Sequence, residues 1–145
     1  MSNDADAFLY YGFDLDEEDA GRVCGDEEWE HIYAATHGIH EPSKEPDSWD
    51  NDDDPITQTW SEYWAMVREC IAKCPCEIEF WGSDQEQIYF ISVKEATYRT
   101  DWSNSKPINW LGTKVEWQDQ IRKFCGRMKI EVPPSIGWRL AARWF

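Results

Sequence analysis

Basic residues are scarce in this chain, where 14 Lys and Arg stand against 29 Asp and Glu and give a formal net charge of −15. Proteins that bind a phosphate backbone do so largely by neutralising it with Lys and Arg. The shortage of positive charge therefore argues against direct binding to nucleic acid. The chain also lacks any run of 18 apolar residues, and its first six residues contain two aspartates and no basic residue. We therefore expect neither a membrane span nor a secretion signal.

Glycine is also sparse, with eight in 145 residues, and none belongs to a phosphate-binding loop, a dinucleotide fingerprint or a G-x-S-x-G motif. The many carboxylates show no spacing that singles out a catalytic pair. We therefore expect no enzymatic activity and no cofactor. The five cysteines are an odd number in a chain without an expected secretion signal, which predicts reduced thiols in the cytoplasm.

Negative charge is concentrated in the first third of the chain. Residues 1–54 hold 18 acidic residues against Arg22 and Lys44, whereas residues 55–145 hold 11 against 12 basic ones. Dense blocks of like charge often act as interaction surfaces, and the Trp and Tyr interleaved here would be rare in a purely solvating segment. We expect one domain over residues 1–145, with a partly ordered acidic insertion over residues 14–58; a solubilising loop is the alternative. The candidate partner-binding residues are Asp16, Glu17, Glu18, Asp26, Glu27, Glu28, Trp29, Trp49, Asp50, Asp52, Asp53 and Asp54.

Helical periodicity appears in two places. A capping box (T-x-x-E) begins at Thr59 and another at Thr113, and apolar residues follow each at intervals of three and four. These patterns predict helices over residues 60–73 and 114–125. A shorter helix is expected over residues 27–36, within the acidic insertion. The tryptophans expected in the core are Trp60, Trp64 and Trp117.

Four segments rich in aromatic and β-branched residues predict strands, over residues 8–13, 77–81, 87–93 and 137–145. The order strand, helix, strand, strand, helix, strand indicates an α+β protein with the ferredoxin-like split-βαβ pattern. There, both helices cover one face of a four-stranded antiparallel sheet, and the first and third strands lie in its middle. An apolar face left open is expected to bind a partner or to form a homodimer.

The two ends of the chain carry a resemblance. Residues 8–13 read FLYYGF with acidic residues behind them, and residues 137–144 read GWRLAARW. In these stretches the chain resembles small uncharacterised bacteriophage-encoded proteins. The resemblance implies a phage origin and the host-cell cytoplasm, and it assigns no reaction or ligand.

Two metal sites are conceivable from composition. Cysteines spaced C-x3-C-x-C from residue 70, with one more on the second long helix, offer the thiolates that structural zinc favours. The spacing differs from C-x2-C, and free cysteine is usually buried, so we expect buried thiols and no metal. Residues 50–54 place Asp at three EF-hand positions, but Pro55 and Ser61 stand where Gly and Glu are needed. We expect a solvated turn there, with weak divalent-ion binding as the alternative. The cysteines considered above as zinc ligands are Cys70, Cys74, Cys76 and Cys125.

The leading prediction is a non-enzymatic interaction or inhibitor protein that presents its acidic third to a basic host protein. Closely spaced carboxylates present a density of negative charge like that of duplex DNA, which carries about one negative charge per 1.7 Å of axis. The protein would then act as a nucleic-acid mimic or an anti-defence protein. The alternative is a module that binds or sequesters a nucleotide-like small molecule through loop tryptophans and arginines. Its candidate residues are Trp102, Trp110, Arg99, Arg139 and Arg143. A purely structural or dimerising protein is a third class.

Overall fold

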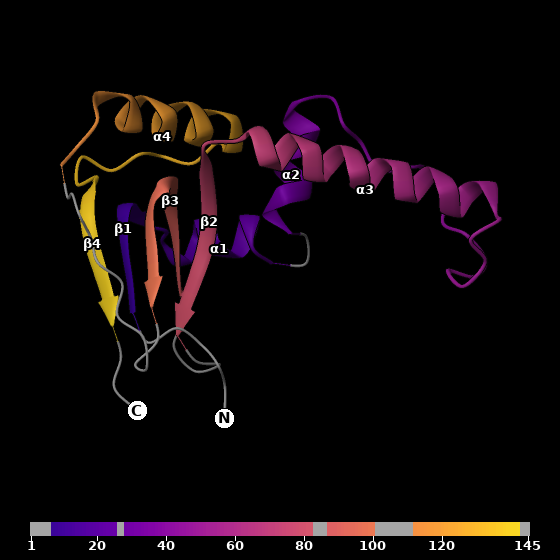
Figure 1. Cartoon of the computed structure of the whole chain (residues 1–145), viewed down its shortest axis with the longest axis horizontal. Coiled ribbons are helices and arrows are strands. Elements are labelled where there is room, and N and C mark those ends of the chain that lie inside the picture. Colours follow the sequence, from indigo (N-terminus) through magenta and orange to yellow (C-terminus); the bar gives the residue numbers. More distant parts are fainter. Residues whose placement is uncertain (1–6, 26–27, 83–86, 101–111, 143–145) are drawn as a thin grey trace. The chain divides into compact units, whose positions relative to one another are not determined.

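The computed structural model describes residues 7–25, 28–82, 87–100 and 112–142, which contain four helices and four strands (Figure 1). The chain divides into two compact units. The first comprises Met1–Arg22 and Pro75–Phe145, and the second is Val23–Cys74. Each unit contains its own cluster of buried aromatic and aliphatic side chains.

The first unit is built on a four-stranded antiparallel sheet with the order β2-β3-β1-β4 (Figure 1). The α+β class and the four predicted strands are confirmed, and β1 and β3 lie in the middle of the sheet as expected. β3 continues seven residues beyond its predicted end, and β4 is described as far as Ala142. The strands are β1 (Ala7–Asp14), β2 (Cys76–Gly82), β3 (Gln87–Thr100) and β4 (Gly137–Ala142).

The helices do not complete the ferredoxin-like arrangement. Helix α4 (Val115–Met128) lies across the sheet and contacts β2 and β3 (Figure 1). The other long helix, α3 (Pro55–Lys73), belongs to the second unit. The expectation that both helices pack on one face of the sheet is therefore wrong. The reason is that α2 (Trp29–Thr36) packs on α3, so the apolar stripe of α3 is buried within the second unit.

Three aromatic rings join α4 to the sheet. Trp117 of α4, buried at 3% exposure, meets Tyr11 of β1 at 5.2 Å and Trp138 of β4 at 5.8 Å between ring centroids. The indole N–H of Trp117 donates a hydrogen bond to the carboxylate of Glu95, and this bond, with Lys114 alongside, lowers the pKa of that carboxyl. The prediction that Trp117 belongs to the core is confirmed.

A second aromatic cluster lies on the opposite face of β1, because neighbouring residues of a strand point to opposite sides. Tyr10 stacks on Phe90 at 3.9 Å, and Phe8 meets the same ring edge-on at 5.3 Å. All three side chains are buried, so they form a core rather than a bare sheet face. The register between β1 and β3 shifts here, and the backbone of β3 comes so close that a Cβ at Gly12 would lie 1.8 Å from the carbonyl oxygen of Ile91.

The starts of the two long helices differ from the prediction. Asp54 caps α3 by accepting a hydrogen bond from the backbone N–H of Ile56 (2.9 Å), and Pro55 occupies the first turn. Pro is favoured there because its missing N–H would have no helical partner. Thr59 lies inside the helix and donates to a backbone carbonyl instead. Helix α4 begins after Lys114, which gives no side-chain cap. Both predicted capping boxes are therefore wrong.

Helix α1 (Glu17–Val23) was not predicted, because its sequence has no apolar stripe. Its first turn is acidic, which the positive end of the helix dipole favours. The carboxylate of Asp16 accepts a hydrogen bond from a backbone N–H of that turn (2.8 Å). At its other end, Arg22 donates to the carbonyl oxygens of Met128 and Lys129, both at 2.9 Å. Charge at the helix ends and these long-range hydrogen bonds therefore order a segment for which the sequence pattern alone predicts a loop.

Candidate functional site

Two tryptophans of the second unit stand exposed beside each other. Trp49, from the loop before α3, and Trp64, on α3, are 47% and 43% exposed. Their rings are nearly parallel, at 8°, with centroids 5.9 Å apart. Trp60 is buried beside them, meets each ring edge-on, and donates its indole N–H to the carbonyl oxygen of Lys44 (2.8 Å). This buried anchor holds the exposed Trp49–Trp64 pair in place.

The assignment of Trp64 to the core is wrong, whereas that of Trp60 is confirmed. Helix α2 has eight residues against the 19 of α3. It buries the stripe of Trp60, Tyr63 and Val67 around its own Ala34. One helix covers only a narrow stripe of α3, and Trp64, which is not part of this cluster, remains 43% exposed beside it.

Residues 47–54 (DSWDNDDD), here called the acidic loop, carry Trp49 among five aspartates and no basic residue. Asp47, Asp50, Asp52 and Asp53 are exposed, and Asp54 is half-buried because it caps α3. Backbone N–H groups of the loop bond to side-chain and carbonyl oxygens of Ser48 and Asn51, at 3.2–3.3 Å. The loop is therefore a folded turn that presents its carboxylates next to the Trp49–Trp64 pair.

A groove of about 640 Å³ runs along α3 from Trp64 and is here called the Glu30 groove. Within it, His31 Nδ1 lies 2.7 Å from the hydroxyl of the buried Tyr63, and His31 Nε2 lies 3.9 Å from the carboxylate of Glu28. Burial raises the pKa of Glu30, and the charge of Glu28 raises it further, against a backbone hydrogen bond that lowers it. The residues lining the groove are Glu28, Glu30, His31, Trp64, Val67, Arg68, Ile71 and Ala72.

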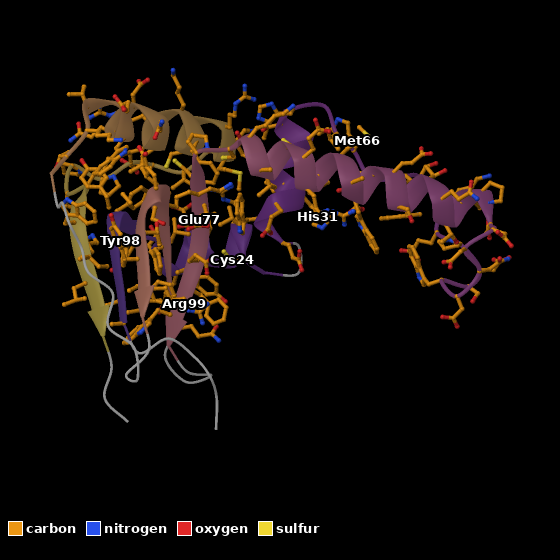
Figure 2. The ribbon with its side chains drawn as sticks, viewed as in Figure 1. Cys24, His31, Met66, Glu77, Tyr98 and Arg99 are labelled. Carbon is orange, nitrogen blue, oxygen red and sulfur yellow. The ribbon has the colours of Figure 1, made fainter. Side chains whose placement is uncertain are left out.

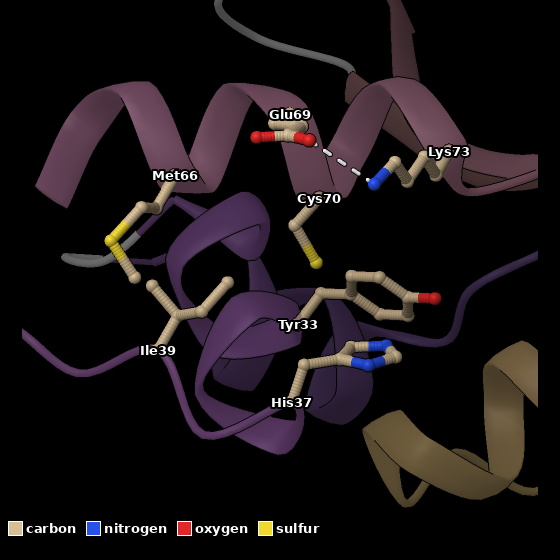
Figure 3. Close-up of a pocket in the computed structure, with 7 residues that line it drawn as sticks. All are labelled: Tyr33, His37, Ile39, Met66, Glu69, Cys70 and Lys73. Atoms are coloured by element: carbon tan, nitrogen blue, oxygen red, sulfur yellow. Dashed lines mark hydrogen bonds and ion pairs between the residues drawn. The ribbon is translucent and has the colours of Figure 1, made fainter. Parts of the chain in front are cut away.

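A second groove, of about 430 Å³, follows another side of α3 (Figure 3). In Figure 2, Met66 and His31 lie along opposite edges of α3, which separates this groove from the Glu30 groove. The thiol of Cys70 points toward the ring of Tyr33 (Figure 3). An exposed ion pair between Glu69 and Lys73, at 3.1 Å, forms the rim. The lining residues are Tyr33, His37, Ile39, Met66, Glu69, Cys70 and Lys73.

The predicted partner-binding residues fall into separate places. The structure gathers Trp49 and the aspartates of the acidic loop, and it places Glu28 in the Glu30 groove. Trp29 is buried and packs edge-on against Tyr33, so it contributes to packing rather than to an exposed surface. Residues 16–18 begin α1 in the first unit. Asp26 and Glu27 lie outside the described residues.

The structure describes two of the residues proposed for the alternative function, small-molecule binding. These two arginines lie on one face of the sheet. The guanidinium of Arg99 lies 5.5 Å from the ring centroid of Phe8 (its place on β3 is marked in Figure 2). Arg139 is paired in register with Tyr10, and its Nη1 lies 3.9 Å from the carboxylate of Asp14. Trp102, Trp110 and Arg143 lie outside the described residues.

The cysteines give no metal centre in the part of the chain that the structure describes, where no group of three or more His, Cys, Asp or Glu side chains could hold an ion. Cys74, Cys76 and Cys125 are buried, and Cys70 is half-buried. Burial, with a contribution from Asp19, raises the pKa of Cys125 to about 12. The Cys125 thiol is therefore protonated at neutral pH.

Comparison with protein-family models, with curated proteins and with solved structures gave no match to this chain. None of the described helices is long and apolar enough to cross a bilayer.

Proposed function

We propose that this protein is a non-enzymatic interaction protein that binds a basic host protein through the Trp49–Trp64 pair and the acidic loop. The observation that carries the proposal is the pair itself, two stacked indoles left in solvent beside a folded turn with five aspartates. Exposed large aromatic side chains are typical of the residues that dominate interface energies. Carboxylates around them accelerate encounter with a positively charged partner.

The combination favours a basic protein over other partners. Arg and Lys bind the faces of indole rings through cation–π contacts and pair with carboxylates, and here both kinds of group lie together. A protein that normally grips nucleic acid presents such side chains in number. We propose that the target is a protein of that kind in the host-cell cytoplasm, where this chain would act as an inhibitor by occupying the basic surface.

The test compares two triple variants that remove the same negative charge. Asp50→Asn/Asp52→Asn/Asp53→Asn neutralises the acidic loop but keeps the cap at Asp54. The control neutralises three exposed acids of the first unit: Glu116→Gln, Asp119→Asn and Glu131→Gln.

Proteins retained from a bacterial lysate at low salt and in 1 M salt are identified by mass spectrometry, and the association rate of any basic protein is then measured with purified components. We expect the wild type and the control to retain the same basic protein at low salt, and the loop variant to associate more slowly. At 1 M salt the difference should disappear, because the Debye length falls to about 3 Å. If both triple variants lose binding equally, or if no basic protein is retained, the acidic loop is not the interface.

A second candidate function is supported by the shared face of Arg99 and Arg139, which flank the aromatic rings of Phe8 and Tyr10. The two guanidinium groups favour an anionic small molecule such as a nucleotide, whose phosphates they would bind. Thermal denaturation with nucleoside mono-, di- and triphosphates tests it, because a ligand of the folded state raises Tm. Arg99→Gln/Arg139→Gln should abolish the rise.

A further inference from the structure

The Glu30 groove combines three kinds of surface in one concavity. Two carboxylates, Glu28 and Glu30, come from the start of α2. The exposed indole of Trp64 provides an aromatic wall, and Val67 and Ile71 of α3 provide apolar surface. A ligand that matches all three carries a cation, a group that packs on the indole face and an aliphatic stem.

Charge in the groove favours a cation. The two glutamates are opposed by Arg68, which is exposed, so the lining carries one net negative charge when His31 is neutral. Glu30 is half-buried, and its burial disfavours the charged carboxylate. A cation placed beside Glu30 would relieve that cost, because an opposite charge at short distance stabilises the ionised form.

The groove is also continuous with the proposed interface, because Trp64 belongs to both. The ring of Trp64 stacks on Trp49 and also lines the groove. A segment of a partner lying on the Trp49–Trp64 pair can therefore place a side chain in the groove. The volume of about 640 Å³ is within the range of pockets that hold small ligands, so a long side chain fits.

We propose that the Glu30 groove receives an arginine side chain of the basic partner, with its guanidinium between Glu30 and the indole of Trp64. This inference rests on the proposed function. Arginine satisfies the groove better than lysine, because a guanidinium is planar, stacks on aromatic faces and pairs with carboxylates through two parallel N–H groups. Its methylene stem would cover Val67 and Ile71.

The probe is the peptide acetyl-Gly-Arg-Gly-amide, compared with the same peptide carrying citrulline, which has the shape of arginine without its charge. Binding to the ¹⁵N-labelled full chain is followed by NMR at the indole N–H of Trp64, which the variant Trp64→Phe assigns. We expect the arginine peptide to shift this resonance saturably. Glu30→Gln should weaken the binding of the peptide about fivefold, which is the size of effect expected when one partly exposed charge pair beside a cation–π contact is lost.

Two further variants keep the test decisive. Glu69→Gln, on the rim of the other groove, is the matched control and should bind the peptide as the wild type does. Ala72→Phe fills the Glu30 groove from an exposed position and should abolish binding without disturbing the core. Equal binding of the citrulline peptide, or unchanged binding by both Glu30→Gln and Ala72→Phe, would overturn the proposal.

The result separates this inference from the proposed function. The loop variant Asp50→Asn/Asp52→Asn/Asp53→Asn should weaken binding to the basic protein but bind the arginine peptide with wild-type affinity. If the loop variant loses the basic protein while Glu30→Gln and Ala72→Phe retain both ligands, the groove is wrong and the interface stands. If the arginine peptide binds as expected but the loop variant keeps the basic protein, the interface is wrong at the acidic loop, and the groove remains a site for arginine.

Discussion

The indole of Trp49 lies parallel to that of Trp64, with ring centroids 5.9 Å apart at an angle of 8°, although one belongs to a loop and the other to a helix. About half of each side chain lies in solvent. The buried Trp60 supports both rings from the side. An aromatic surface held in this way loses little conformational freedom on binding, which favours its use as an interface.

The support given by Trp60 and the exposure of Trp64 predict different costs of truncation. Trp60→Ala should lower the free energy of unfolding by about 3–5 kcal/mol, because it empties a buried site and removes the hydrogen bond to Lys44. Trp64→Ala should cost about 1 kcal/mol or less, since much of its ring is already hydrated. Urea denaturation followed by far-UV circular dichroism measures both. Equal losses would show that Trp64 is a packing residue.

Asp54 should contribute to stability, unlike the other aspartates of the acidic loop. Asp54→Ala removes the side chain that accepts from the Ile56 N–H and should cost about 1 kcal/mol, whereas Asp54→Asn keeps an effective cap. Asp53→Ala, one residue earlier, is the control. It should be neutral or slightly stabilising, because it removes one of several neighbouring negative charges that repel each other. Thermal denaturation distinguishes the three variants, and a loss in Asp53→Ala as large as that in Asp54→Ala would contradict the assignment of the cap.

Two glycine-to-alanine substitutions should have opposite signs. Gly12→Ala would bring a Cβ against the backbone of β3, where the nearest atom cannot rotate away, and should destabilise the protein by about 3 kcal/mol or more. Gly126→Ala lies within α4, where a Cβ meets no atom within 4 Å, and should stabilise by about 0.5–1 kcal/mol. Differential scanning calorimetry provides the comparison. A neutral Gly12→Ala would mean that β1 and β3 are further apart than described.

Cys24 should be accessible to solvent yet slow to react. Burial raises the pKa of its thiol to about 11, and the charge of Glu30 contributes to the rise. At pH 8 its thiolate fraction, and hence its rate of alkylation by iodoacetamide, should be about a hundredfold below that of a cysteine whose pKa is about 9. The rate should continue to increase with pH beyond 10, because the raised pKa keeps the thiol protonated up to that range.

Peptide mapping by mass spectrometry measures this rate at Cys24 alone. Glu30→Gln should accelerate alkylation at pH 8, since removing a neighbouring negative charge lowers the pKa of the thiol. Glu28→Gln serves as the control for a change of charge in the same groove and should have a smaller effect. Alkylation of wild-type Cys24 as fast as an unperturbed cysteine would contradict the burial of this thiol.

Local patterns identified most of the secondary structure. The apolar stripes of α3 and α4, the aromatic strand segments and the short helix ending before Gly38 are all properties of a few neighbouring residues, and the structure contains each of them. The patterns misplaced the helix starts, because T-x-x-E occurs inside α3 while the cap is the aspartate before Pro55. They missed α1 altogether, since its order depends on Arg22 reaching the end of α4.

The sequence alone therefore determined the α+β class, the strands with β1 and β3 in the middle of the sheet, and the confinement of the net negative charge to residues 1–54. Only the tertiary structure decided which helix packs on which element, because α3 presents the same apolar stripe whether α2 or a sheet covers it. It also decided that Trp60 is buried and Trp64 exposed, because the cluster around Ala34 of α2 takes in Trp60 and leaves Trp64 beside it. The candidate site arises from that second decision, since the exposed Trp64 of α3 lines one groove with Glu28 and Glu30 from the start of α2.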